Sequence, residues 1–153
     1  MKTRIPLDGG APKMVYSFNK PKSALPRGRE MFMELKALLQ AFAVCKLNDM
    51  ANVNLNTEFC YFARTDEELS LVCEEGCIPP NTAACEKGWR AFRIQGVLDF
   101  SLIGILSKIS TILADNGVGI FAVSTYNTDY VFTKAGQFDS ALELLRRAGY
   151  SVV

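Results

Sequence analysis

The candidate reactive or ligand-binding side chains of this chain are those of one polar stretch and of five cysteines. The stretch is "STYNTDY" (124–130), which carries hydroxyls and one carboxylate between two apolar, strand-like segments. The cysteines include no C-x-x-C pair, and the chain has no histidine. Histidine is the commonest general base and metal ligand, so an enzyme would have to use thiols, carboxylates, Lys or Tyr. Catalysis is therefore not expected.

The cysteine spacing predicts free thiols at Cys45, Cys60, Cys73, Cys77 and Cys85. Zinc sites usually show tighter paired spacing, often with His, so we expect neither bound zinc nor a structural disulfide. Structural thiols in a reducing cytosol are the preferred interpretation. A reactive or metal-binding thiol near Cys73 and Cys77 is the alternative. The predicted location is cytoplasmic, and no cofactor or metal is predicted.

Composition and charge narrow the class of protein. A chain of 153 residues with 49% hydrophobic and 22% charged residues predicts a globular protein of one domain or two small ones. The net charge of +1 produces no strong field toward nucleic acid or an anionic membrane. No apolar run approaches the roughly 20 residues that span a bilayer. Neither a nucleic-acid partner nor a membrane partner is expected.

Residues 1–34 differ from the rest in being basic and containing Pro and Gly. This composition favours a flexible or loosely docked N-terminal extension. An organelle-targeting leader and a basic contact arm are the alternatives. No apolar segment follows the basic start, so a secretory signal is not expected.

Residues 35–88 are predicted to be rich in strands. Strands are expected at 35–47, as one long or two short strands, and at 58–64 and 69–75, as a hairpin. The alternative to the hairpin is a short helix started by Thr65, with Glu68 completing a capping box. Residues 76–88 contain two consecutive prolines and are predicted to be a linker or boundary loop.

Residues 89–153 show a clearer order. The pattern predicts strands at 89–96, 118–125, 129–134 and 150–153 and helices at 101–117 and 138–149. This β-α-β-β-α-β order is typical of a ferredoxin-like fold, with two helices on one face of a four-stranded antiparallel sheet. The fold class is therefore α+β, a ferredoxin-like unit at 89–153 preceded by a strand-rich unit at 35–88. The first unit could be a degenerate copy that shares a continuous sheet with the second.

The ends of the two helices carry recognisable signals. Ser101 is the expected N-cap of the first helix, and Gly117 is the expected left-handed residue after it. Gly149 is expected to end the second helix. The predicted buried face of that second helix consists of Phe138, Ala141, Leu142, Leu145 and Ala148.

Two features of this unit suggest a ligand site. The loop 98–104 ends at a helix N-terminus, which favours an anion. Gly104, predicted inside the first turn, either allows tight packing on the sheet or lets a ligand approach, and Asp99 either caps the helix or faces the ligand. Alternation places Thr125 on one face, and Asn127 is expected to make the turn with positive φ.

The polar stretch itself has two interpretations. Its residues are either ordinary turn residues or the wall of a pocket. A helix end that favours a carboxylate, near a strand edge that carries one, matches the two charges of a free amino acid.

At this point the chain resembles a known family. "WRAFRIQGVLDFSLIGILSKISTILADNGVGIFAVSTYNTDYVFTK" (89–134) is similar to the second domain of small tandem ACT-domain proteins, and "RTDEELSLVC" (64–73) is similar to their first domain. The family in turn resembles the ACT repeats of CASTOR-type arginine sensors and aspartate kinases. The first half departs from the pattern in lacking a clear first helix.

The resemblance implies a regulatory module that binds an amino acid between adjacent domains. Asp99 and the backbone of Ser101, Leu102, Ile103, Gly104 and Ile105 match the loop expected to hold the ligand carboxylate. Asp129 is expected to take the ammonium or a basic side chain, and Thr125 and Tyr126, beside Ser124, form the wall. A homodimer and a regulated enzyme partner are expected on the same basis.

Three functions follow from these observations. The first is a non-enzymatic regulatory or sensor protein that binds a free amino acid. The second is a ligand-free interaction module that pairs with itself or a client protein through sheet edges. The third, an enzyme using thiols or carboxylates, is disfavoured by the absence of histidine and of a nucleophile motif.

Overall fold

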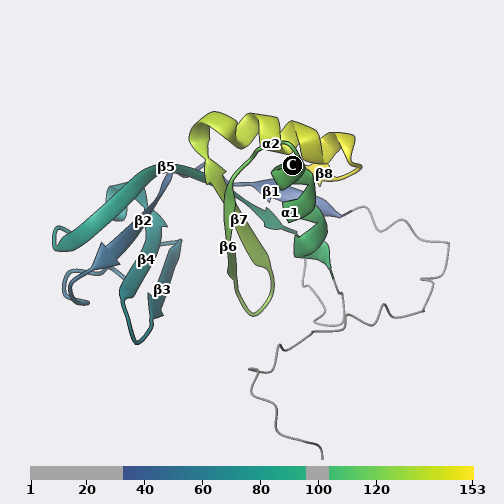
Figure 1. Ribbon diagram of the computed structural model, residues 1–153. Coiled ribbons are helices and arrows are strands. Elements are labelled where there is room, and N and C mark those ends of the chain that lie inside the picture. Colours follow the sequence, from purple (N-terminus) through teal and green to yellow (C-terminus); the bar gives the residue numbers. More distant parts are fainter. Residues whose placement is uncertain (1–32, 96–103) are drawn as a thin grey trace, which may run out of the picture. The chain divides into compact units, whose positions relative to one another are not determined.

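The computed structural model describes residues 33–95 and 104–153 (Figure 1). In chain order the elements are β1 (Glu34–Ala37), β2 (Phe42–Leu47), β3 (Cys60–Arg64), β4 (Leu69–Glu74), the 3-10 helix η1 (Glu75–Cys77), β5 (Thr82–Ile94), α1 (Ile105–Asp115), β6 (Ile120–Ser124), β7 (Asp129–Lys134), α2 (Ala135–Arg147) and β8 (Ser151–Val152). The site residues predicted at Asp99, Ser101, Leu102 and Ile103, and the extension up to residue 32, lie outside the described residues. Neither α1 nor α2 is long and apolar enough to span a membrane.

Strand β5 is the centre of the sheet. Trp89 pairs with Phe42 of β2 on one side and with Lys134 of β7 on the other, and Phe92 pairs in the same way with Ala37 of β1 and Val131 of β7. β1 and β2 therefore lie one after the other along one side of β5. The strands run in the order β3-β4-β2-β5-β1-β8, with β7 on the other side of β5 and β6 on β7.

The predicted linker at 76–88 is wrong for its second part, because β5 begins at Thr82. The two prolines do interrupt regular structure, but only as far as residue 81. Gly88 adopts a φ of 79° inside the strand, and the β2–β5 register shifts between Phe42 and Val44. This is the geometry of a β-bulge that requires a left-handed residue. The bulge bends β5, so its two halves pair with different strands.

The first half of the chain repeats the strand arrangement of the second. β4 lies antiparallel between β2 and β3, as β7 lies antiparallel between β5 and β6. The register is the same, since Phe42 pairs with Glu74 where Trp89 pairs with Lys134. In the described chain between residues 33 and 88 no α-helix is found, and only η1 follows β4. The continuous sheet and the helix-poor first unit are therefore as predicted.

The two predicted hairpins are present. β3 pairs with β4 and β6 pairs with β7, and the segment 35–47 forms two short strands. Thr65 does not start a helix. Its hydroxyl accepts the backbone N–H groups of Glu67 and Glu68, at 3.2 and 3.1 Å, which closes a turn.

The helices α1 and α2 cover one face of the second unit (Figure 1). The core between helices and sheet contains Leu35, Phe92, Ile94, Ile109, Leu113, Val118, Val131, Phe138, Ala141, Leu142 and Leu145. Ala148 is exposed, contrary to prediction, because α2 has ended at Arg147; α2 also begins at Ala135, earlier than predicted. Gly117 and Gly149 follow the helices with φ of 72° and 97°, as their left-handed role requires.

The last strand does not complete a four-stranded antiparallel unit, which corrects the sequence prediction. β8 pairs in parallel with β1, and β1 lies between β8 and β5. The Val153 N–H donates to the Leu35 carbonyl at 2.9 Å, and the Gln95 N–H donates to the Glu34 carbonyl at 2.7 Å. Leu35 is fully buried beneath the helices. A strand from the start of the first unit thus completes the core of the second.

The opposite face of the second unit packs on an aromatic cluster. Phe42 meets Phe132 edge to face, with ring centroids 5.3 Å apart, and Tyr61 lies at 5.3 Å from Tyr130. Aromatic pairs at this separation add stabilisation beyond the area that they bury. β7 is therefore buried on both faces: Val131 faces the helices, and Phe132 faces the aromatic cluster.

A third cluster lies on the first unit, on the face that corresponds to the helix-covered face of the second. Its buried members are Ala43, Cys45, Leu47, Leu71 and Cys73, with Cys60 and Cys77 packed against them. Burial, more than the neighbouring Cys85, raises the pKa of Cys45 from 9.0 to about 12. Burial also raises the pKa of Cys73 to about 11. Both thiols are therefore protonated at neutral pH.

We expect Leu35→Ala to destabilise the whole second unit, because Leu35 is a buried core residue on a strand that the unit borrows. Truncation of such a side chain costs about 2–5 kcal/mol in free energy of unfolding. Lys36→Ala, on the exposed side of the same strand, is the control and should change it by less than about 0.5 kcal/mol. Urea denaturation measures both. Equal, small effects would mean that β1 is dispensable.

The thiol pKa shifts predict a loss of stability at alkaline pH. A thiol whose pKa is raised in the folded state binds its proton more tightly there, so stability is complete below about pH 9 and falls between pH 9 and 12. In this window, Cys45 alone should lower the free energy of unfolding by about 1 kcal/mol per pH unit. The free energy of unfolding, measured by urea denaturation under reducing conditions, should fall less steeply with pH for Cys45→Ala than for the parent. An unchanged slope would contradict the assignment.

Candidate functional site

The polar stretch at 124–130 forms the turn of the β6–β7 hairpin. The Thr125 N–H and hydroxyl both donate to the Thr128 carbonyl, at 2.9 and 2.8 Å. The β3–β4 turn has the same pattern, since the Thr65 N–H and hydroxyl donate to the Glu68 carbonyl at 2.9 and 3.4 Å. The Thr125 hydroxyl is therefore accounted for by the turn. Asn127 does not have a positive φ, contrary to prediction. Among the described residues other than glycine, the one with a positive φ is Asn52.

Thr128 ties this turn to the end of β5. Its side chain is buried, and its hydroxyl donates to the Ile94 carbonyl at 2.6 Å. The equivalent position in the β3–β4 turn is the exposed Glu68. The anchor is thus particular to the second unit, and it holds the hairpin turn against the last residues of β5.

A small polar hollow lies where this turn meets β5. Its volume is about 230 Å³, and it is lined by Arg93, Ile94, Gln95, Thr125, Asn127, Thr128 and Tyr130. The Arg93 Nε–H donates to Gln95 Oε1 at 3.1 Å, which orients the guanidinium. A guanidinium with adjacent amides and hydroxyls suits a carboxylate, which Arg can bind through two hydrogen bonds.

Two tyrosines connect this hollow to the aromatic cluster. Tyr130 pairs with Arg93 across the β5–β7 ladder, and its ring lies against Tyr61. Burial raises the pKa of Tyr61, the neighbouring Tyr130 raises it further, and Arg93 opposes the shift. The phenol of Tyr61 is therefore neutral at physiological pH. It can donate a hydrogen bond but does not act as a base.

Residues 84–147 match the model of the ACT domain. The crystal structure of protein Atu0741 from Agrobacterium tumefaciens is 31% identical in sequence, with a TM-score of 0.71 over 79% of this chain and 92% of that one. The chain belongs to the ACT-domain family.

Two further structures share the ACT fold with this chain. VC0802 from Vibrio cholerae, a protein of unknown function described as a possible transport protein, is 20% identical, with a TM-score of 0.61 over 76% of this chain and 89% of that one. The ligand-free regulatory subunit of aspartate kinase from Thermus thermophilus is 11% identical, with a TM-score of 0.54 over 74% and 95%. No curated protein matches the sequence.

The structure distributes the predicted site residues over the two faces of the ACT hairpin. Ser124 and Asp129 pair directly across the ladder, one register step from Val123 and Tyr130. Because successive residues of a strand alternate, Asp129 points to the helix-covered face and Tyr130 to the aromatic face. Thr125 lines the hollow, whereas Asp129 does not. The side chain of Tyr126 is 83% exposed.

Gly104 and Ile105 lie at the start of α1. Gly104 is the N-cap residue with a φ of 86°, and not part of the first turn as predicted. A Cβ there would meet no described atom within 4 Å, so tight packing does not explain the glycine; its left-handed backbone does. Ile105 packs against the helix-side core. No hydrogen bond between described residues joins Gly104 or Ile105 to the hairpin turn.

Arg93 of β5 and Gln95, directly after it, line the hollow but were not predicted as site residues. Arg93 and Gln95 lie two apart in the strand and so share a face, with Tyr130 opposite Arg93. The signal was a pair of polar residues, Arg93 and Gln95, spaced two apart around the otherwise apolar end of a strand. This signal indicates a site only once the register of β5 and β7, which places Arg93 opposite Tyr130, is known.

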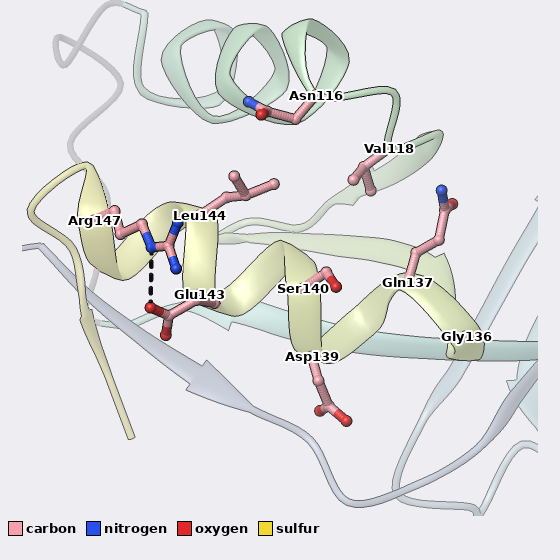
Figure 2. Close-up of a pocket in the computed structure, with 9 residues that line it drawn as sticks. All are labelled: Asn116, Val118, Gly136, Gln137, Asp139, Ser140, Glu143, Leu144 and Arg147. Carbon is pink, nitrogen blue, oxygen red and sulfur yellow. Dashed lines mark hydrogen bonds and ion pairs between the residues drawn. The ribbon is translucent and has the colours of Figure 1, made fainter.

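A larger hollow lies between the end of α1 and α2 (Figure 2). Its volume is about 590 Å³, but its charged residues, Asp139, Glu143 and Arg147, are exposed and each has an ion-pair partner. The Arg147 Nε–H donates to Glu143 Oε1 at 3.1 Å, and the Gln137 amide donates to the Gly117 carbonyl at 3.2 Å. Asp139 points away from α1 in Figure 2 and pairs with Arg90 at 3.7 Å. These are the contacts of a solvated helix surface.

Within residues 33–95 and 104–153, no group of three or more Cys, Asp or Glu side chains could hold a metal ion. The candidate site of this ACT domain is therefore the hairpin end with its neighbouring hollow. Its chemistry is that of charged and polar groups suited to binding.

Thr128→Val tests whether the anchor holds this end of the ACT domain together. It leaves the buried Ile94 carbonyl without its donor, which costs about 1–3 kcal/mol in free energy of unfolding. Thr128→Ser retains the hydroxyl and is the matched control, with a smaller expected loss. Denaturant unfolding of the two variants gives the comparison. If valine and serine are equally stable, the 2.6 Å hydrogen bond contributes little.

Proposed function

We propose that this chain is a non-enzymatic regulatory protein that binds a free amino acid at the end of the β6–β7 hairpin. The observation that carries the proposal is the polar hollow between the hairpin turn and β5, in an ACT domain. Its volume of about 230 Å³ lies below the roughly 300–1,000 Å³ of pockets for drug-sized ligands, which favours a ligand as small as an amino acid. The structural likeness to an aspartate kinase regulatory subunit supports a regulatory rather than a catalytic role.

This end of the sheet carries one positive and one negative side chain, on its two faces. Arg93 is the expected partner of the ligand carboxylate, and Asp129 of its ammonium group. Arg93 pairs with Tyr130, the residue after Asp129, so the two charges are one step apart in the ladder and on opposite faces. A ligand lying across the hairpin end would contact both, with Ser124, Thr125 and Tyr126 beside it. This arrangement would select a zwitterion over a simple acid or amine.

The remaining predicted residues belong to the same proposal. Gly104 and Ile105 bring the first free backbone N–H groups of α1, and the segment with Asp99, Ser101, Leu102 and Ile103 precedes them in sequence. Free amides at a helix start favour a carboxylate. A Gly104 substitution would not test this idea, because any side chain would strain the left-handed backbone there.

The first experiment is a thermal-shift screen of the full chain against the twenty amino acids. A ligand that binds only the folded state should stabilise it by about 2.7 kcal/mol at a hundredfold excess over Kd. A melting temperature that no amino acid raises would favour the ligand-free interaction module. Self-association and a regulated enzyme are predictions as well, and light scattering of the chain tests the former.

Asp129→Asn and Arg93→Gln should each weaken binding of the amino acid found in the screen. Each removes one charge-assisted hydrogen bond of about 1.5–3 kcal/mol, a loss of roughly 10- to 100-fold in affinity. Thr125→Val should weaken binding less, and because its hydroxyl closes the turn, any loss reports the position of the turn as well as a ligand contact. Isothermal titration calorimetry measures all three.

The β3–β4 turn offers matched controls. Asp66→Asn and Arg64→Gln make the same charge changes at exposed positions of that hairpin and should leave Kd unchanged. If Asp129→Asn binds as tightly as Asp66→Asn, then Asp129 is a turn residue. If Arg93→Gln alone weakens binding, the ligand occupies the hollow without reaching the helix-covered face.

A further inference from the structure

Two thiols face each other across the β2–β5 pair. Cys45 and Cys85 are direct partners in the antiparallel register, and their Sγ atoms lie 3.4 Å apart. We propose that Cys45 and Cys85 form a reversible disulfide, a redox-modification site that cross-links β2 to β5. The proposal concerns the first unit and does not depend on ligand binding at the β6–β7 hairpin.

The backbone geometry allows the bond. Direct partners in an antiparallel pair have Cα atoms about 4.5–5.5 Å apart, within the roughly 4.4–6.8 Å that disulfides span. An S–S bond is about 2.05 Å long, so the two sulfurs must approach by a little over 1 Å. Rotation about the Cα–Cβ bonds supplies this approach without a change in strand pairing.

One of the two thiols is open to a reagent from solution. Cys85 is exposed, whereas Cys45 is buried. Both line a hollow of about 300 Å³ whose charged residues are Lys46, Glu68 and Glu86. In the second unit the corresponding face is covered by α1 and α2. In the first unit no α-helix of the described chain covers the face that carries Cys45 and Cys85. Within the described residues, Cys85 is therefore accessible from this face.

The reaction needs an oxidant, and a small-molecule disulfide such as oxidised glutathione is the class that we propose. The Cys85 thiolate attacks one glutathione sulfur, forming a mixed disulfide and releasing one glutathione thiolate. The Cys45 thiolate then attacks the Cys85 sulfur and releases the second glutathione. Two protein thiols lose two protons and two electrons, and one glutathione disulfide becomes two thiols.

The environment of Cys45 sets the rate of the second step. Burial is the largest cause of its raised pKa and persists when Cys85 is a mixed disulfide, and Cys73 is then the titratable group that still faces it. Since only the thiolate attacks, the rate of closure should rise about tenfold per pH unit between pH 7 and 9. Such a pair is slow to oxidise and stays reduced unless the oxidant persists.

The chain contains an internal comparison. Cys60 and Cys73 are also direct partners, in the β3–β4 pair, and Cys73 is as buried as Cys45. Cys60 is only partly exposed, however, so the reagent reaches Cys85 more readily. Oxidation should therefore select the Cys45–Cys85 pair over Cys60–Cys73.

The experiment uses the full chain, reduced and then incubated with oxidised glutathione, followed by alkylation and peptide mass spectrometry. The expected product is a Cys45–Cys85 cross-link that forms faster at higher pH and is reversed by dithiothreitol. The cross-link constrains residues 46–84 in the unfolded chain, so the melting temperature should rise by roughly 5–10 °C. Cys60→Ser should form the same cross-link and show the same shift.

Cys85→Ser should abolish both the cross-link and the shift in melting temperature, and because Cys85 is exposed, this variant should fold like the parent. Three results would overturn the proposal: a mixed disulfide that persists on Cys85 without cross-linking, preferential pairing of Cys60 with Cys73, or five thiols that remain reduced. An unchanged melting temperature in cross-linked protein would overturn the placement of the bond between native strands.

Discussion

The structure depends on the bend in β5. The strand is shared by two sheet halves that would otherwise be separate, and the left-handed Gly88 makes the bend possible. Before it, β5 completes the β2-β3-β4 unit; after it, β5 begins the β6-β7 unit. The Gly88 N–H donates to Glu75 Oε1 at 2.8 Å, which holds the bulge against η1. Both faces of the second unit follow from this arrangement, because the first unit contributes Phe42 and Phe59 to the aromatic cluster on one side and β1 to the core on the other.

The two units use the same strand pattern to different ends. In the second, α1 and α2 bury a core of branched aliphatic and aromatic side chains. In the first, the helices are absent from the described residues, and the equivalent face is closed by small thiols, leucines and short loops. A face without helices has less area to bury, and small side chains such as cysteine suit it. The same lack of cover leaves Cys85 exposed beside the buried Cys45.

The β3–β4 and β6–β7 turns share one hydrogen-bond pattern, and the second turn has additional contacts. Thr65 and Thr125 close their turns in the same way, so a hydroxyl at that position is a structural requirement. What distinguishes the second turn is the Thr128 anchor and the polar residues brought beside it by β5. The difference between the hairpins, rather than either one alone, marks the candidate site.

The sequence by itself determined the elements and the family. The periodicity of the two helices, the glycines at 117 and 149 that follow them and the two hairpins are local properties, and each was predicted within a few residues. The motifs at 64–73 and 89–134 sufficed to indicate ACT domains. These signals are local because helix caps, turns and periodicity depend on neighbours in the chain.

Tertiary structure alone decided which strands are neighbours. Nothing in "ELKA" states that it lies between β5 and β8, since a short strand pairs by the edges available to it and the core it fills. The proline pair suggested a linker, yet β5 starts two residues later because β2 offers it a partner. Arg93 likewise lies beside the hairpin end only because β5 and β7 pair in the register that places it opposite Tyr130. Pairing between segments distant in sequence is a property of the whole packed chain, and it placed both the polar hollow and the two opposed thiols.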